Sequence, residues 1–380
     1  MPGTIVPLIE VFVEIPDFRK SRGKRHPLFA ILALASAAVL CGARSYSAIA
    51  DWGRNYGQPL AQALGFTHAK TPCAATLHTV FRHLDVVLFE SRLRQWAEQV
   101  LAAYPPRPGE DEAIAIDGKT LRGSQKQGAP GTHLLSAVAH RLGVTLGQQA
   151  VDDKTNETFA IEDLLDVLVL SGRVVTMDAL LTQRYIAQTI LDWDGDYVMI
   201  VKDNHPQMLA DIELLFQELS VVADTVTAAY DVDAGHGRIE PRLLVASSAL
   251  ADYLRWPGLQ QVFRLERTVT IKKTGQQRQE VVYGLTSLSP ARADAAHLLR
   301  LTRDHWQIEN RSHWVRDVTF DEDRSQVRCG NIPEIMAALR NLAIGLMRLA
   351  GDTNIAAACR RYAAQPWAAL ALIGVQPKTE

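Results

Sequence analysis

Residues 104–112, YPPRPGEDE, constrain the fold of this 380-residue chain more than any other stretch. Three prolines, a glycine and an acidic run cannot continue a helix, so the chain must change its structure there. Before this stretch, apolar residues recur at helical spacing between glycine and proline breaks. They predict helices over residues 27–41, 45–55, 58–65, 73–84 and 86–103. We therefore expect an all-helical N-terminal domain over residues 1–104.

Residues 113–350 show the pattern of an α/β domain. Short β-type runs at 113–117, 133–140, 144–151, 173–178 and 196–201 alternate with helical spacing at 157–170 and 181–193. This order predicts a mixed sheet with helices on its faces. A helix at 206–219 and four further strand-like runs predict a β-rich insertion at about residues 205–290. Residues 351–380 are left as a C-terminal tail.

The charge balance limits the kinds of partner. Forty lysines and arginines stand against forty-two aspartates and glutamates, which gives a formal net charge of −2. A dedicated nucleic-acid-binding protein usually has a basic excess, so any DNA contact must use local patches. The four cysteines are far apart and form no CxxC pair, as is typical of reduced thiols in a cytoplasmic protein.

An apolar run at residues 28–43, LFAILALASAAVLCGA, follows five basic residues and imitates a secretory signal. It starts far from the N-terminus, behind several acidic residues, and it is shorter than the ~20 residues that span a bilayer. We therefore predict a buried helix in a soluble protein. The basic residues before it and the amphipathic stretch at 74–85 each have two interpretations: ordinary solvated or packed structure, or contact with DNA.

Two of the predicted buried strands end in a carboxylate, Asp117 and Asp178. Each also has an ordinary explanation, because Asp117 precedes Gly118 as a turn former does and Asp178 suits a helix N-cap. Charges at the strand ends of an α/β sheet converge where ligands bind, which favours a shared function.

A third acid, Glu309, lies in the segment HWQIENRSHWVRDVTFDED. On a continuous helix at 100° per residue, one line within about 40° holds Thr302, His305, Glu309, His313 and Arg316. Ile308 and Val315 fall on a neighbouring side and predict docking onto a core. Three carboxylates brought together repel one another unless cations lie between them, and all-oxygen ligands favour Mg²⁺ or Mn²⁺.

Six ordered blocks carry a family resemblance: IAIDGKTLRGS, DKTNETFAIEDLL, VVTMDALLTQ, DYVMIVKDNHPQML, GHGRIEPR and HWQIENRSHWVRDVTFDED. Together with RHPLFAILAL near the start, they resemble the DDE transposases of ISAs-type insertion sequences, the H-repeat-associated family. The resemblance implies a ribonuclease H-like catalytic domain. Carried onto the matching positions, its catalytic and metal-binding triad is Asp117, Asp178 and Glu309.

The same resemblance implies a chemistry and a set of partners. The expected reaction is DNA strand cleavage at the ends of an insertion sequence, followed by strand transfer into target DNA, with two Mg²⁺ or Mn²⁺ ions per active site. The expected partners are terminal inverted repeats, target DNA and a second copy of the chain in a dimeric synaptic complex. The expected location is the cytoplasm, at the nucleoid.

Nine polar residues around these acids are candidate DNA contacts: Lys119, Arg122, Lys154, Lys202, Asn204, His305, Asn310, His313 and Arg316. Thr302, His305 and Arg316 occupy places where related transposases carry Tyr, Arg and Lys. Lys119 is equally a solvated charge at a strand end, and the segment around Lys154 can simply open the next helix. Trp306 and Trp314 are either platforms for unstacked bases or core residues.

Two other functions remain open. His305, Glu309 and His313 are spaced four and four, as ligands of a transition metal such as zinc would be on a helix of a hydrolase, although no HExxH motif lies nearby. Alternatively, the chain is a transposase-derived DNA-binding protein that has lost catalysis. The three intact acids argue against that second alternative.

Overall fold

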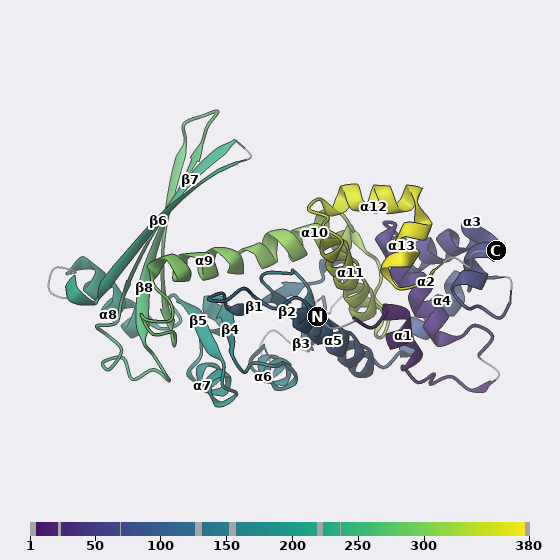
Figure 1. Cartoon of the computed structure of the whole chain (residues 1–380), viewed down its shortest axis with the longest axis horizontal. Helices are drawn as coiled ribbons and strands as arrows, with labels where there is room; N and C mark the ends of the chain where they lie inside the picture. The colour runs from purple at the N-terminus through teal and green to yellow at the C-terminus, as the bar shows by residue number, and fades with distance from the viewer. Residues whose placement is uncertain are drawn as a thin grey trace. The chain divides into compact units, whose positions relative to one another are not determined.

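The structure, a computed structural model, describes residues 5–21, 24–68, 70–125, 131–151, 157–218, 223–235 and 237–376. It divides into two compact units (Figure 1). The helical unit consists of Met1–Pro108, Gly118–Ala160 and Ile308–Glu380, and the sheet unit of Gly109–Asp117 and Ile161–Gln307. Strand β1 (Glu112–Thr120) contributes to both, because the boundary falls between Asp117 and Gly118.

The helical unit follows the sequence closely. It contains α1 (Leu8–Val13), α2 (Leu28–Leu40), α3 (Tyr46–Ala63), α4 (Ala74–His83), α5 (Val86–Ala103), β2 (His133–Ala139), β3 (Thr145–Val151), α10 (Trp314–Val318), α11 (Ile332–Leu349), α12 (Ile355–Ala364) and α13 (Pro366–Leu372). The helices predicted at 45–55 and 58–65 are joined as α3, which kinks where Gly57 adopts a φ of 61°. Only glycine takes such a conformation at little cost, so the break that the sequence indicated is a kink rather than a gap.

Helix α2 packs against α1, α3, α11, α12 and α13. All of its side chains except that of Phe29 are buried. A helix that is apolar on every side needs neighbours on every side, and these five helices supply them. The prediction of a buried helix is therefore confirmed. Within the described residues, no helix has the length and apolar character needed to cross a membrane.

The sheet unit carries the mixed sheet. It contains α6 (Glu157–Val167, from Ile161 onward), β4 (Arg173–Met177), α7 (Arg184–Asp192), β5 (Asp196–Val201), α8 (Pro206–Gln217), β6 (Val226–Gly235), β7 (Arg238–Ser247), β8 (Gln261–Ile271), β9 (Gln277–Thr286) and α9 (Ala295–His305). Its strands follow the order β1-β4-β5-β9-β8-β7-β6. The first three are parallel and the later pairs are antiparallel. The predicted mixed α/β architecture with a helical N-terminal region is confirmed.

The β-rich segment after α8 differs from our expectation of an extra piece beside the sheet. Strand β9 pairs with β5, with Val198 opposite Thr286, so the antiparallel strands extend the same sheet. A β5 strand without this neighbour would expose a row of unpaired backbone groups, which natural sheets avoid. The segment therefore completes one side of β5 and forms the long ribbons of β6 and β7 in Figure 1.

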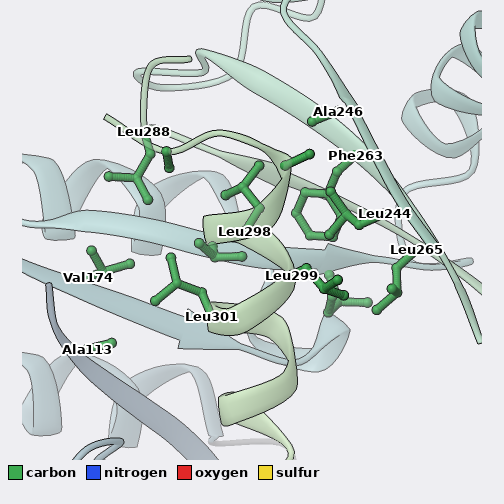
Figure 2. Close-up of a cluster of buried hydrophobic side chains, with 14 of the residues drawn as sticks. Ala113, Val174, Leu244, Ala246, Phe263, Leu265, Leu288, Leu298, Leu299 and Leu301 are labelled. Carbon is green, nitrogen blue, oxygen red and sulfur yellow. The ribbon is translucent and has the colours of Figure 1, made fainter. Parts of the chain in front are cut away.

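Helix α9 fastens this extension to the parallel strands (Figure 2). Its Leu298 and Leu301 lie in one buried apolar cluster with Leu244 of β7, Phe263 of β8 and Val174 of β4. Full burial of a leucine side chain contributes roughly 1.5–3 kcal/mol, so this single helix couples both halves of the sheet.

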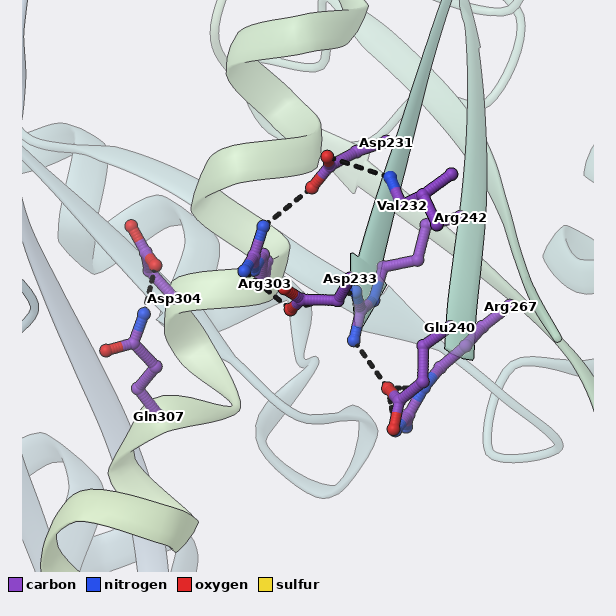
Figure 3. Close-up of polar contacts among 9 residues, drawn as sticks. All are labelled: Asp231, Val232, Asp233, Glu240, Arg242, Arg267, Arg303, Asp304 and Gln307. Atoms are coloured by element: carbon purple, nitrogen blue, oxygen red, sulfur yellow. Dashed lines mark hydrogen bonds and ion pairs between the residues drawn. The ribbon is translucent and has the colours of Figure 1, made fainter. Parts of the chain in front are cut away.

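Ion pairs continue the contact of α9 along the strands (Figure 3). Arg303 of α9 donates to the carboxylates of Asp231 and Asp233 on β6, at 2.6 Å each. On the neighbouring strands, Arg242 and Arg267 both donate to Glu240, at 2.8 Å each. The Arg303 pairs are partly exposed, so each contributes about 1 kcal/mol or less, and their main effect is to orient α9 on the ribbon.

One acid is buried in the helical unit. Glu90 of α5 is only 8% exposed, and its Oε1 has no hydrogen-bond partner among the described residues. Burial raises the pKa of the Glu90 carboxyl to about 8, and the negative charge of Glu334 adds to the effect. The folded protein therefore keeps Glu90 protonated in a range where the unfolded chain ionises it.

This raised pKa predicts a pH-dependent stability. From the ordinary value of 4.5 up to about 8, the folded state holds more protons than the unfolded state, so the free energy of unfolding falls as pH rises. Replacing Glu90 by Gln should remove this pH dependence. Over the whole range it lowers the free energy of unfolding by at most about 5 kcal/mol. Urea denaturation of both proteins across this range measures it, with Glu98→Gln on the same helix as control. Parallel curves for wild type and E90Q would contradict the raised pKa.

Candidate active site

The ends of β1 and β4 bring two predicted site residues together. These strands are parallel, and Ile116 lies opposite Met177 in their register. Asp117 is the next residue of β1 and Asp178 directly follows β4, so the two aspartates lie at neighbouring backbone positions at the same ends of these strands. Asp178 also caps the short turn Ala179–Leu181, because its Oδ1 accepts a hydrogen bond of 2.7 Å from the Ala179 amide. The N-cap interpretation and the site interpretation of Asp178 are thus compatible.

Residues 202–205, after β5, adjoin Asp178. The Lys202 ammonium lies 3.2 Å from Asp178 Oδ1, with about half of each side chain exposed. Asn204 Nδ2 donates to the Ala179 carbonyl at 2.7 Å, and His205 Nε2 donates to the Thr182 carbonyl at the same distance. Lys202 is therefore an accessible cation beside the carboxylate. The Asn204 amide holds the turn in place, and its predicted DNA contact stays a prediction.

The regular α-helix predicted through residues 302–316 is interrupted at Trp306 and by a π-helical turn. Helix α9 ends at His305, a π-helical turn covers Glu309–His313, and α10 begins at Trp314. A π-helical turn takes more residues than the 3.6 of an α-helix, so the spacing of 100° per residue does not hold across it. The spacing that set five polar residues on one line of a helix therefore applies only up to this turn.

The residues of that line have different surroundings. In the sheet unit, His305 is buried and its Nδ1 lies 2.9 Å from Oγ1 of Thr176, inside β4. In the helical unit, His313 is buried, whereas Glu309 and Asn310 are exposed. The predicted docking residues Ile308 and Val315 are both buried, as expected. Only the start of the π-helical turn therefore presents its side chains to the surface.

Asp117 and Asp178 belong to the sheet unit, and Glu309 belongs to the helical unit. Among the described residues, no three His, Cys, Asp or Glu side chains form a group that could hold a metal ion. The structure thus brings together the two aspartates of the predicted triad. Lys154 lies outside the described residues, so its predicted DNA contact stays a prediction.

In the helical unit, the last part of β1 carries a second ionic contact. The Lys119 ammonium donates to both oxygens of Asp317 in α10, at 2.7 and 2.6 Å, and it is only 9% exposed. Lys119 is therefore neither the solvated charge nor the freely accessible phosphate ligand that the sequence suggested. Arg122 is 79% exposed and lies 3.8 Å from Asp323, so it remains open to a DNA contact.

The backbone at Gly123 lies very close to the backbone at Ser325. A Cβ atom at Gly123 would lie 2.1 Å from the carbonyl oxygen of Ser325, so only glycine fits there. Arg328 Nε donates to the Gly123 carbonyl at 3.1 Å. The block LRGS, which follows Asp117, therefore serves to dock this segment on residues 322–328.

Arg316, next to Asp317, lies in a buried ion cluster. Its Nε donates to Glu322 Oε2 at 2.8 Å, and Arg340 Nη1 donates to Glu322 Oε1 at 2.7 Å. The Arg316 side chain is fully buried, which contradicts the predicted contact with a DNA phosphate. Burial alone would raise the pKa of the Glu322 carboxyl, but Arg316 and Arg340 outweigh it and hold that pKa below its usual value.

Sequence reasoning missed Asp317, Glu322 and Arg340. Both acids belong to the block RDVTFDED, but the local sequence does not show which acid of this block is buried. Arg340 lies on α11 at an apolar face whose other members are buried, and that position was a usable signal. A charged residue on an all-apolar helix face needs a buried partner.

The sequence also matches known families along most of its length. A family model described as "Transposase DDE domain" matches residues 108–346, and one described as "DDE_Tnp_1-associated" matches residues 9–97. The chain belongs to the DDE transposase family. The family resemblance of the six sequence blocks is thereby confirmed, and transposase is the function that this membership supports.

Individual relatives agree with this assignment. The chain is 30% identical to "Putative transposase YncI" of Escherichia coli O157:H7, over 91% of this chain and 88% of that protein. It is also 30% identical to "H repeat-associated putative transposase YhhI" of E. coli K12, over 93% of each. Among solved structures, a piggyBac transposase synaptic complex with hairpin DNA is similar over 98% of this chain and 78% of the piggyBac chain. The sequence identity is 12% and the TM-score is 0.41.

The buried cluster gives a prediction for this transposase chain. Changing Glu322 to Gln leaves two arginines without a counter-charge in the interior, which should lower the free energy of unfolding by about 3–5 kcal/mol at neutral pH. Because the folded pKa of Glu322 is depressed, the loss should shrink as pH falls through that pKa. Denaturant unfolding measures both effects.

The matched control for this change is Asp51→Asn. Asp51 pairs with Arg54 on the surface, with more than half of each side chain exposed. Such a pair contributes about 1 kcal/mol or less. Equal destabilisation by the two variants would show that the buried cluster contributes no more than a surface ion pair.

Proposed function

We propose that this chain catalyses metal-dependent DNA strand cleavage at insertion-sequence ends and strand transfer into target DNA, with Asp117, Asp178 and Glu309 as its triad. The observation that carries the proposal is the register of β1 and β4 in a DDE-family chain. The proposal is supported by the pairing of Ile116 with Met177, because Asp117 and Asp178 directly follow these two residues. The exposure of Glu309 at the start of a π-helical turn is consistent with a ligand role.

We further propose a ribonuclease H-like catalytic domain over residues 113–350, with residues 1–104 as an associated DNA-binding domain. The strand pattern supports this. In the helical unit β3, β2 and β1 lie in that order, and the β2–β3 pair is antiparallel. In the sheet unit β4 and β5 continue from β1 in parallel. We propose residues of about 205–290 as the inserted segment and residues 351–380 as the C-terminal tail.

The donor set fits Mg²⁺ or Mn²⁺. Carboxylate oxygens are the ligands that these ions prefer, and two adjacent carboxylates repel each other unless a cation lies near both. Both contacts described for Asp178, those with Ala179 and Lys202, use Oδ1, which leaves Oδ2 for a metal. Asp117, Asp178 and Glu309 would hold the ions, and the chemistry that the ions would supply is activation of the attacking oxygen and stabilisation of the leaving 3′ oxygen.

The chain's own residues supply position and charge around this site. We propose that Lys202, beside Asp178, and Arg122, which is exposed, contact phosphates that flank the scissile bond. Asn204 and His205 hold the turn after Asp178 in a fixed conformation through backbone carbonyls. We propose terminal inverted repeats and target DNA as the substrates, bound by a dimer of the chain.

The first experiment tests the triad. Asp117→Ala, Asp178→Ala and Glu309→Ala should each lower strand cleavage and strand transfer with Mg²⁺ by at least about a hundredfold, because each removes a metal ligand. The substrate is DNA with the terminal repeats that flank the gene. Asp203→Ala, an exposed aspartate between Lys202 and Asn204, is the matched control and should keep its activity. Undiminished activity in any triad variant would remove that residue from the site.

A second experiment separates ligation from a structural role. Asp178→Cys introduces a soft thiolate, which accepts Mn²⁺ more readily than Mg²⁺. The variant should be inactive with Mg²⁺ and regain at least about tenfold activity with Mn²⁺, as measured by strand transfer. Asp178→Ala should show no such recovery. Equal behaviour of the two variants in both metals would indicate that Asp178 does not bind the ion.

The alternative of a zinc hydrolase has less support. The spacing of four and four between His305, Glu309 and His313 assumes a regular α-helix, and residues 309–313 form a π-helical turn. The alternative of a transposase-derived protein without catalysis is decided by the first experiment, since wild-type activity excludes it.

A further inference from the structure

The four antiparallel strands β6 to β9 of the sheet unit form a ribbon with two different faces (Figure 1). Their register places Tyr230, Leu243, Glu266 and Val281 in one row across the ribbon. Side chains alternate along a strand, so every second residue of each strand lies on the same face as this row. We call this face the open face and the opposite one the closed face.

The closed face packs against α9. Its Leu244 and Phe263 belong to the apolar cluster that contains the leucines of α9. Further along the ribbon, Asp231 and Asp233 of the same face accept hydrogen bonds from Arg303 of α9. The closed face therefore already has its partner within the sheet unit.

The open face is apolar although it is exposed. The row of Tyr230 and the rows beside it carry five exposed large apolar side chains: Tyr230, Val232, Ile239, Leu243 and Val281. When one face of an antiparallel sheet packs on a core, the other face is normally polar. Here that pattern is inverted, and a contiguous exposed apolar patch indicates a surface that another molecule covers.

The charges of the open face indicate what kind of molecule this is. Within the four strands as described, its charged residues are Arg264 and Glu266, and they pair with each other at 2.8 Å. Glu266 also accepts a hydrogen bond from Gln279. A face whose cation is already paired is poorly suited to DNA phosphates. An apolar face with one acid and one base can instead meet a copy of itself without net repulsion.

The edge of the ribbon is less suited to such a contact than its open face. Strand β6 is the last strand of the sheet, so a strand of a second chain could in principle pair with it. However, the Val232 amide already donates to Asp231 Oδ1 at 2.8 Å, and acids along an outer strand are a common device against strand addition. Contact through the open face leaves these groups undisturbed.

We infer that the open face packs against the open face of a second copy of this chain, about a two-fold axis. Tyr230, Leu243 and Val281 of each copy then become buried between the two ribbons. The inference deepens the proposed function and rests on it in one respect, because that function includes a dimer of the chain. The strands that form this interface carry none of the proposed catalytic residues.

The test is sedimentation velocity of the full chain without DNA, over a range of chain concentrations. Wild type should form a dimer. Tyr230→Asp and Leu243→Asp should each raise the Kd of this dimer by at least about tenfold, because a two-fold interface places each new carboxylate twice in an apolar contact. Tyr253→Asp is the matched control and should dimerise like wild type, since Tyr253 is 64% exposed, Tyr230 is 67% exposed, and Tyr253 lies outside the four strands.

Two results would overturn the inference. One is a wild-type chain that sediments as a monomer at every concentration. The other is a Kd that the Tyr230 and Leu243 variants leave unchanged, or that the Tyr253 variant raises as much, with folding verified by thermal unfolding. Asp178→Ala is measured in parallel and should stay dimeric while it loses strand transfer. Retained strand transfer in that variant would count against the proposed function and leave the sedimentation result intact.

Discussion

The parallel pairing of β1 with β4 is the interaction on which the candidate site depends. It forms from two short apolar runs that are far apart in sequence, and their register sets Ile116 against Met177. Because side chains alternate along a strand, a slip of one residue would turn one of the following aspartates to the opposite face. The hydrophobic pattern of both strands therefore fixes the geometry of Asp117 and Asp178. Strand β1 then continues into the helical unit, where Lys119 binds Asp317, so one strand serves an acid site and an ionic anchor two residues apart.

Internal ion pairs explain why so few basic residues of the catalytic segment are available to DNA. Arg316 and Arg340 are held by Glu322, and Lys119 is held by Asp317. A buried pair adds little net stability compared with apolar side chains of the same size, whereas breaking it is costly. A buried pair instead restricts how the elements that carry it can pack, because the charges must lie next to each other. Here the arrangement fixes α10, and α10 directly follows the π-helical turn that begins at Glu309.

Sequence periodicity predicted the elements well, since β5 was expected at residues 196–201 and α5 at 86–103, both as observed. Strand-end acids were also predictable, because the position of Asp117 and Asp178 follows from the hydrophobic runs before them. The π-helical turn was not, since a wheel at 100° per residue assumes the regularity that such a turn breaks. The partners of Arg316 were equally hidden, because Glu322 and Arg340 lie on separate elements that only tertiary packing brings together. Which charges face inward is a property of the packed fold, and a near-neutral sequence gives no hint of it.

The internal pairing of charges has a consequence for a transposase whose net charge is only −2. Where most cations of a segment are paired internally, attraction to DNA depends on the few guanidinium groups whose partners are absent or distant. In the helical unit Arg122 is such a group, because its side chain is 79% exposed and its ionic partner Asp323 lies 3.8 Å away. A uniformly basic surface would bind any duplex through its phosphates. A few exposed cations can instead contact DNA only at their own positions, so their placement matters more than the total charge of the chain.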